Sequence, residues 1–288
     1  MRRSLLAIAP AAALLLAACG SSSGGSSSTS ASSTASASST CSPASLQTIQ
    51  SGALTVATGD PAYPPWVEDN KPESGKGFEA AVAYAVAKKL GYTDAQVTWV
   101  RTGFDDAVKP GPKTFDFNIQ QYSITDERKK AVDFSSSYYD LTQAVITYEG
   151  SSIAGATTVA ALKDAKLGAA VGTTSLKAIS DVIQPTNQAQ VFNDNAAAVT
   201  ALKNKQIDGM VVDLPTAFYL VGAEIDKGKI VGQLPNTADK QEQLGLLLAK
   251  NSPLTTCVTQ AVDALRTDGT LAQLQDQYLA QAGAPVLK

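Results

Sequence analysis

The chain of 288 residues contains no histidine, and its three cysteines stand far apart at positions 19, 41 and 257. Without histidine, the sequence excludes Ser-His-Asp and Cys-His nucleophile pairs, His-ligated zinc and acid–base catalysis by imidazole. The cysteine spacing excludes a CxxC metal or redox motif. A formal net charge of −3 and a pI near 5.1 lack the basic excess typical of a nucleic-acid-binding protein. Carboxylate or Ser/Lys chemistry remains, or no catalysis at all.

The sequence also lacks long apolar runs, and a short one lies near its start. Arg2 and Arg3 precede an apolar run over residues 5–16, which is short for a membrane span and typical of a signal peptide. The run ends in Leu-Ala-Ala-Cys, which resembles the lipobox of bacterial lipoproteins and marks Cys19 for lipidation. An ordinary signal peptide cut near an A-x-A site is the alternative. The stretch 21–40, almost entirely Ser, Gly, Ala and Thr, favours the lipoprotein, because such a flexible tether suits an anchored cysteine.

Export would place the two remaining cysteines in an oxidising compartment. A disulfide between Cys41 and Cys257 would fasten the start of the fold to a late helix, and the chain-entropy estimate for so long a loop is at most about 4–5 kcal/mol. Two buried free thiols are the alternative.

From residue 46 onward, short apolar runs alternate with patterns of helical period. This alternation predicts an α/β fold with mainly parallel sheets. Ser252 and Pro253 form a good N-cap and N1 pair for a helix through Arg266. The expected strands lie at 54–57, 97–100, 115–120, 135–139, 143–147, 167–171, 207–212 and 245–249, and the expected helices at 77–90, 159–162, from 172, 196–202, 252–266 and 271–280.

Several motifs, taken in order, identify a family. Gly-Asp-Pro-Ala-Tyr-Pro-Pro-Trp follows the first strand, and Gly-Phe-Glu opens the first helix. Ser-Ile-Thr-Asp-Glu-Arg comes before Val-Asp-Phe-Ser, and Gly-Thr-Thr-Ser and Asp-Gly-Met-Val-Val-Asp follow in the middle third. Their order and spacing resemble the family-3 extracellular solute-binding proteins, the amino-acid receptors of ABC importers. The motifs begin at residues 59, 77, 123, 132, 172 and 208.

The resemblance implies a two-lobe, periplasmic-binding-protein-like (type II) α/β fold that closes on its ligand by a hinge. Strand crossings near 139–143 and 241–245 would make lobe 1 discontinuous, with lobe 2 inserted in it. Lobe 1 would hold both the chain start and the late helices, so that the Cys41–Cys257 disulfide could form. The expected boundaries are 1–18 for the signal peptide, 19–45 for the lipid-anchored Ser-rich linker, 46–140 and 244–288 for lobe 1, and 141–243 for lobe 2.

The family's ligand is a zwitterion, and each of its charges needs a partner in the site. By the resemblance, Arg128 binds the α-carboxylate, which its planar guanidinium fits bidentately, and Ser123 adds a donor. Asp213 pairs with the α-ammonium. The structural alternatives are a surface arginine bonded to Asp126 or Glu127, and an N-cap at position 213 for the helix that begins at Pro215.

The other expected ligand-binding residues surround this charged pair. Gly172, Thr173 and Thr174 match a loop of lobe 2 whose helix N-terminus would meet the carboxylate, a plain turn being the alternative. The aromatic rings on the first loop would clamp the ligand's aliphatic part, with Trp66 standing where the family usually has Phe; a core position is its alternative. Two glutamines replace the usual small residues before Ser123, and an extra carboxylate on the first loop favours a cationic or N–H-donating side chain. These residues are Asp60, Tyr63, Trp66, Gln120 and Gln121.

The sequence as a whole therefore predicts a binding protein and not an enzyme, with no catalytic residue, cofactor, metal site or nucleic-acid partner. The expected protein is a monomer anchored through Cys19 to the outer face of the cytoplasmic membrane. It would capture a polar or basic amino acid and deliver it to an ABC permease and its ATPase. A ligand-sensing subunit of a membrane receptor, and a dehydratase on the same fold, are the alternatives.

Overall fold

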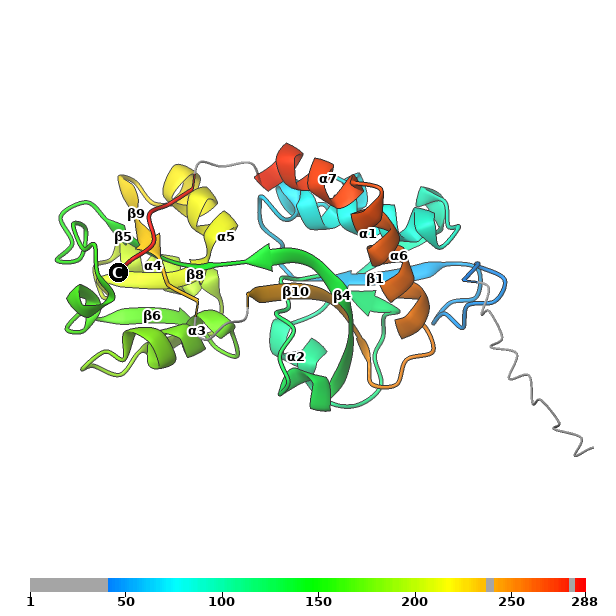
Figure 1. Ribbon diagram of the computed structural model, residues 1–288, viewed down its shortest axis with the longest axis horizontal. Helices are drawn as coiled ribbons and strands as arrows, with labels where there is room; N and C mark the ends of the chain where they lie inside the picture. The colour runs from blue at the N-terminus through cyan, green and yellow to red at the C-terminus, as the bar shows by residue number, and fades with distance from the viewer. Residues whose placement is uncertain (1–40, 237–240, 280–282) are drawn as a thin grey trace, which may run out of the picture. The chain divides into compact units, whose positions relative to one another are not determined.

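The structure is a computed structural model that describes residues 41–236, 241–279 and 283–288. The predicted signal peptide, Cys19 and the linker up to residue 40 lie outside the described residues. The described chain forms two five-stranded sheets, each flanked by helices (Figure 1). We call the sheet β2-β1-β3-β10-β4 and its helices lobe 1, and the sheet β7-β6-β8-β5-β9 and its helices lobe 2. Within the described ranges, no helix has the length and apolarity to cross a bilayer.

Lobe 1 has an apolar core on each face of its sheet. The larger core lies under α1, α6 and α7, and the smaller one lies under the short helix α2. The first strand is buried along its whole length, including its two threonines, which explains why its sequence carries no charged residue. The elements are β1 (Leu54–Thr58), α1 (Phe78–Lys89), β2 (Val97–Arg101), α2 (Phe104–Val108), β3 (Phe117–Asn118), β4 (Val132–Leu141), β10 (Glu242–Ala249), α6 (Thr255–Thr267) and α7 (Thr270–Leu279).

Lobe 2 repeats this arrangement. One core lies under α4 and α5, and a second core lies on the opposite face of the sheet, against the segment that continues α3. Residues 179–183 and 220–224 extend α3 and α5 as single π-helical turns. The elements are β5 (Gln143–Tyr148), β6 (Leu167–Ala170), α3 (Thr174–Ala178), β7 (Gln190–Phe192), α4 (Asn195–Lys203), β8 (Gly209–Asp213), α5 (Leu214–Tyr219) and β9 (Gly228–Gln233).

Two strands carry the chain between the lobes. β4 ends at Leu141 and β5 begins at Gln143, so a single residue separates the two sheets, and Figure 1 shows β4 running toward lobe 2. The return path follows β9, and β10 begins at Glu242, which pairs with Leu141. The first two crossings therefore lie side by side, and a rotation between the lobes needs dihedral changes at only a few residues along them.

The last residues of the chain depart from the predicted boundaries, which assigned everything after residue 244 to lobe 1. Val286 pairs with Gln233 of β9, and Leu287 is buried in a core of lobe 2. The main-chain N–H groups of Gln233 and Leu287 complete this pairing. The chain therefore returns to lobe 2 after α7, because an apolar side chain close to its end finds a place in that core.

Three details of the secondary structure also differ from the sequence prediction. Each sheet is mixed, because β10 runs antiparallel to its neighbours in lobe 1 and β5 does so in lobe 2. Helix α6 begins at Thr255, and the Ser252 hydroxyl accepts the Leu254 N–H and does not cap the helix. Three elements, β7, β9 and α2, are absent from the prediction, because they are short or exposed and carry a weak periodic signal.

A disulfide joins Cys41, where the described chain begins, to Cys257 of α6. Their Cα atoms lie 5.4 Å apart, and 216 positions separate them in the sequence. The bond connects the start of the fold to the late helices of lobe 1, as the sequence and the family resemblance predicted.

We expect labelling of the denatured, unreduced protein to find no free thiol at positions 41 and 257. Replacing both cysteines by alanine should lower the free energy of unfolding by up to about 4–5 kcal/mol, because the cross-link restricts the unfolded chain. The measurement is denaturant unfolding, with reduced wild type as the matched control, which should lose a similar amount. Labelling at both positions would contradict the disulfide.

Candidate functional site

A tight turn positions Arg128 at the edge of lobe 1. The Thr125 hydroxyl accepts the main-chain N–H of Arg128 at 3.1 Å, and the Thr125 carbonyl accepts the N–H of Lys129 at 3.0 Å. A single 3-10 turn over Arg128–Lys130 then leads into β4. The Ser-Ile-Thr-Asp-Glu-Arg motif is therefore a capped turn that directs one cationic side chain away from the sheet.

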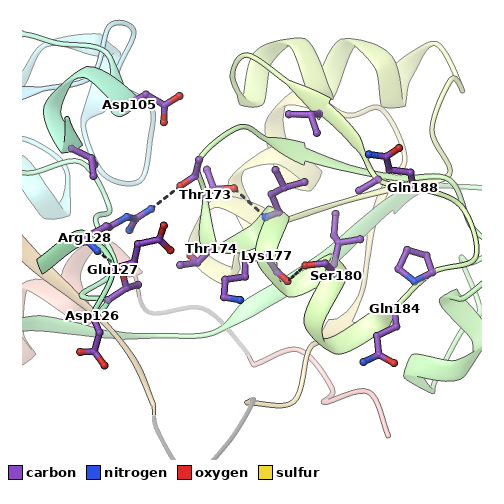
Figure 2. A pocket seen from close by; sticks show the side chains of 18 of the residues that line it. Asp105, Asp126, Glu127, Arg128, Thr173, Thr174, Lys177, Ser180, Gln184 and Gln188 are labelled. Carbon is purple, nitrogen blue, oxygen red and sulfur yellow. Dashed lines mark hydrogen bonds between the residues drawn. The ribbon is translucent and has the colours of Figure 1, made fainter. Parts of the chain in front are cut away.

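The guanidinium of Arg128 links the two lobes. Nη1 donates to the carbonyl oxygen of Ser123 in lobe 1, and Nη2 donates to that of Gly172 in lobe 2, each at 2.9 Å. Figure 2 shows the side chain reaching toward the chain before Thr173. The guanidinium also lies 5.3 Å from the centroid of the Phe104 ring, and the residue is 8% exposed.

Burial lowers the pKa of Arg128 from its usual value, although a guanidinium keeps its proton in proteins. Across the described ranges, no carboxylate forms an ion pair with this cation. A buried charge whose direct partners are neutral is costly, so the surroundings of Arg128 favour an anion. The alternative, a surface arginine bonded to Asp126 or Glu127, does not describe this side chain.

Ser123 lies where both lobes and the returning strand meet. Its main chain bridges to Leu244 of β10, which buries the residue. The hydroxyl lies 3.1 Å from Thr174 Oγ1 of lobe 2 and donates to Glu242 Oε1 at 2.6 Å. Gln143, the first residue of β5, donates to Glu242 Oε2 at 3.0 Å, so this carboxylate is held from both lobes.

Asp213 ends β8 and directly precedes α5, yet its carboxylate does not cap that helix. It accepts instead from Gln143 Nε2, at 2.9 Å from Oδ1. Burial and the negative charge of Glu242 raise the pKa of Asp213 to about 7, although the Gln143 bond and Arg128 act in the opposite direction. The second oxygen of this half-buried carboxylate is available for a cationic donor.

The loop at Gly172 approaches lobe 1 closely. Gly172 has φ of 71°, which a residue with a side chain rarely adopts, and a Cβ on it would lie 2.1 Å from Oδ1 of Asp105, so that carboxylate would have to move to admit one. Thr173 caps α3 by accepting the N–H of Leu176 at 3.1 Å. The predicted helix start is therefore present as a capped turn, with the Thr174 hydroxyl pointing back toward Ser123.

The first loop of lobe 1 holds residues with different exposure. Asp60 is exposed at the rim of a cavity, so the buried, unpaired carboxylate expected from the sequence is not found there. Tyr63 is half-buried, and burial together with Asp194 and Glu224 raises the pKa of its phenol. The loop is braced by Arg101, which donates to the carbonyl oxygen of Gly59 at 2.7 Å.

Trp66 is almost completely buried. Only 2% of it is exposed, and it packs against Phe78 and edge-on against Tyr139 in the core of lobe 1. Its indole N–H donates to the Thr216 hydroxyl of lobe 2 at 2.8 Å. The ring thus belongs to the core of lobe 1 and also lines a cavity of about 190 Å³ beside Tyr63 and Gln121, and its polar edge forms a further hydrogen bond between the lobes.

The two glutamines before Ser123 face different surroundings. Gln120 accepts the Tyr122 hydroxyl at 3.0 Å, and its amide nitrogen packs against Gly59. Gln121 has φ of 49° and is held by the buried carboxylate of Glu79, which accepts its main-chain N–H at 2.7 Å. Both side chains take up space that the small residues usual in the family would leave open.

Two connected cavities lie beside these residues. One of about 280 Å³ brings seven of the predicted residues together with Phe104. One of about 190 Å³ shares Tyr63 and Gln121 with it and reaches α4 and α5. Arg128 instead lines a wider groove of about 1290 Å³ on its other flank (Figure 2). The predicted residues that line the first cavity are Asp60, Tyr63, Gln120, Gln121, Thr173, Thr174 and Asp213.

Sequence reasoning missed four residues of the site. Phe104 stacks on Tyr122 at 4.6 Å between centroids and supports the Arg128 guanidinium. An aromatic residue just after a strand was the available signal for it. Glu79 was visible within its motif but had no assigned role, and nothing in the local sequence of Gln143 or Glu242 indicates that β5 and β10 bring them together.

The arrangement contains one buried cation, several carboxylates and a group of hydroxyls at the junction of two lobes. Such a set is suited to holding a small molecule that carries both charges, with its anionic group at Arg128 and its cationic group at Asp213.

Comparison with known proteins places the chain among binding proteins. The family model for bacterial extracellular solute-binding proteins, family 3, matches residues 54–281. The L-arginine-binding protein of Pseudomonas aeruginosa is 29% identical over 226 residues, covering 76% of this chain and 85% of that protein. The L-cystine-binding protein TcyJ of Escherichia coli is 28% identical over 241 residues, covering 83% and 86%. An ancestral arginine-binding protein bound to glutamine superimposes with a TM-score of 0.65 at 29% identity, covering 81% of this chain and all of that one.

We expect Asp213→Asn to stabilise the ligand-free protein at pH 8 by about 1–2 kcal/mol, after allowance for solvent screening of a half-buried group. The folded-state pKa lies near 7, above the ordinary aspartate value of 3.8. The folded protein therefore holds this proton more tightly than the unfolded chain, and the stability that the group contributes is lost as the pH rises from about 4 through 7.

The measurement is urea unfolding of wild type and variant at pH 4 and pH 8. The stabilisation should be present at pH 8 and absent at pH 4. Asp226→Asn, which removes an exposed carboxylate, is the matched control and should change neither value. Equal effects at both pH values would contradict the perturbed ionisation of Asp213.

Proposed function

This chain belongs to the bacterial extracellular solute-binding proteins of family 3, and we propose that it binds one polar or basic amino acid between its lobes and delivers it to an ABC permease. The observation that carries the proposal is the buried Arg128 guanidinium at the junction of the lobes, whose direct partners are two neutral carbonyl groups. A ligand carboxylate would supply the missing negative charge in a geometry that a guanidinium fits.

The ammonium end of the ligand would lie at Asp213. This carboxylate belongs to lobe 2, whereas Arg128 belongs to lobe 1, so a zwitterion satisfies one charge on each side. A ligand shifts the equilibrium toward the closed form only by its differential affinity for that form. A molecule that needs both partners provides such a difference, and a molecule with only one of the two charges does not.

The side-chain preference is proposed from the surplus of negative charge. Asp213 and Glu242 share Gln143 as a hydrogen-bond donor, and Asp60, Asp194 and Glu224 lie near the cavities. With Arg128 as the one buried cation among the described site residues, a ligand side chain that is cationic or donates N–H groups is favoured over an acidic one. Relatives named for arginine, cystine and glutamine ligands support this range.

Thermal denaturation in the presence of each of the twenty amino acids tests the proposal, because a ligand that binds the native state raises its stability. We expect one or a few polar or basic amino acids to do so. With that ligand, Arg128→Ala should weaken binding by about two to three and a half decades, since losing one partner of a buried charge pair costs about 3–5 kcal/mol.

Arg128→Lys should recover part of the loss, because it restores the charge without the bidentate fork. Calorimetric titration gives the dissociation constants. Lys88→Ala removes an exposed positive charge from α1 and serves as the control for a change in net charge. If Arg128→Ala bound within a factor of a few of wild type, the carboxylate would have to lie elsewhere.

We also propose that lipidation of Cys19 holds the protein at the outer face of the cytoplasmic membrane. The Leu-Ala-Ala-Cys motif and the Ser-rich stretch after it support this, and both precede the described residues. Because one acyl chain gives only weak anchoring, two or more are expected. Mass spectrometry of the native protein should find an acylated Cys19 at the N-terminus. An unmodified N-terminus in the secreted fraction would defeat the proposal.

A further inference from the structure

The carboxylate of Glu79 is fully buried at the start of α1, and its three partners are neutral donors. The Tyr138 hydroxyl and the main-chain N–H of Gln121 donate to Oε1, the latter at 2.7 Å, and Nε2 of Gln121 donates to Oε2. Two of the three bonds therefore come from one residue of the site. The carboxylate fixes both the main chain and the side chain of Gln121.

These bonds determine how the Gln121 amide is turned. An ionised carboxylate only accepts hydrogen bonds, so the amide must direct its nitrogen at Glu79. Its oxygen is then the polar atom left for the cavities, and Gln121 lines both the cavity of about 280 Å³ and that of about 190 Å³. Neither Arg128 nor Asp213, the proposed partners of the ligand's two charges, lines the second cavity, so we assign this oxygen to the side-chain end of the site.

We propose that Glu79 is a positioning residue that keeps the amide oxygen of Gln121 toward the cleft and so selects ligands whose side chain donates an N–H. The inference rests on the proposed amino-acid-binding function and adds a determinant of specificity to it. Glu79 acts through Gln121 and does not itself touch the ligand.

Glu79→Gln separates this role from simple support of the fold. The main-chain N–H of Gln121 cannot turn round, so the introduced amide must place its oxygen opposite that N–H and opposite the Tyr138 hydroxyl. Its nitrogen then replaces Oε2 and faces the Gln121 amide. Gln121 has to present its oxygen to this new donor and its nitrogen to the cleft. Every hydrogen bond remains satisfied, but the polarity that the cleft offers is reversed.

The test measures the dissociation constants of L-glutamine and the γ-methyl ester of L-glutamate by calorimetry at pH 8. The two ligands have similar shape and equal charge, and only glutamine donates from the end of its side chain. We expect wild type to prefer glutamine and Glu79→Gln to lower the ratio of the two constants by about tenfold, the effect of one hydrogen bond. A merely structural role would weaken both ligands alike and leave the ratio unchanged.

Two further variants control the experiment. Tyr138→Phe removes a donor to Glu79 but leaves both bonds from Gln121, so it should keep the wild-type ratio. In a Gln121→Leu background, Glu79→Gln should have no effect on the ratio, because the amide that it turns is gone. A change of ratio in that background would overturn the inference.

Acidification of wild type should reproduce the change, since burial raises the pKa of Glu79 to about 7. A protonated Glu79 donates from one oxygen, as the amide of the variant does. Tyr122 and Tyr138 are the other titratable groups close to this carboxylate, and their raised pKa values keep both neutral. Asp213 feels the same charge, but its titration acts on the ammonium that both ligands share and cancels in the ratio.

The outcomes distinguish this inference from the proposed function. If no amino acid bound the wild type, both would fall together. If wild type bound amino acids but not glutamine, or if Glu79→Gln left the ratio of constants unchanged, only the role of Glu79 would be wrong and amino-acid binding would stand.

Discussion

A guanidinium buried between two lobes needs negative partners, and this requirement organises the site around Arg128. Its present hydrogen bonds reach one carbonyl group in each lobe, and the Phe104 ring lies beside it. The turn that begins at Thr125, the pairing of Ser123 with β10 and the lack of a side chain at Gly172 all serve to bring this cation to the junction. The same group thus both joins the lobes and attracts an anion.

Two carboxylates of the site, Asp213 and Glu79, are unfavourable for the stability of the ionised protein. Asp213 and Glu79 both have pKa values raised to about 7, chiefly because burial disfavours their charged forms. A fold selected for stability alone would not keep two such carboxylates close together. Under the proposed function both would serve a ligand, Asp213 by direct contact and Glu79 through the conformation of Gln121.

Much of this fold could be predicted from the order of strands and helices, because β1, α1, β6 and β8 have strong apolar patterns and clear ends. The motif at Arg128 likewise indicated a turn, and the structure adds that its arginine is buried. The antiparallel strands β5 and β10 could not be oriented, since the reversal arises where the chain crosses between lobes and not in their own sequences. The contact of Leu287 with lobe 2 is equally invisible, because a single apolar residue near a chain end has no periodicity.

Within the site, the types of residue could be predicted better than how deeply each side chain is buried. Trp66 carries the same aromatic signal whether it faces a ligand or a core, and in the fold it does not choose: it packs against Phe78 and Tyr139 and also lines a cavity of the site. Asp60 was expected as an extra carboxylate near the side-chain end of the ligand, yet it lies exposed at the rim of a cavity. Glu79 shows the reverse error, since a glutamate in the first turn of a helix is ordinarily a solvated residue.

The ends of the described chain lie on different lobes. Cys41 is fastened by its disulfide to α6 of lobe 1, whereas the final residues pair with β9 of lobe 2. A tether at the N-terminus would therefore hold lobe 1 and leave lobe 2 as the moving partner. Fluorescent proteins fused to the two ends would then travel with opposite lobes, so the energy transfer between them would follow opening and closing. Because its two ends lie on different lobes, the chain could report ligand binding through terminal fusions, and no reporter would need to be inserted into a loop.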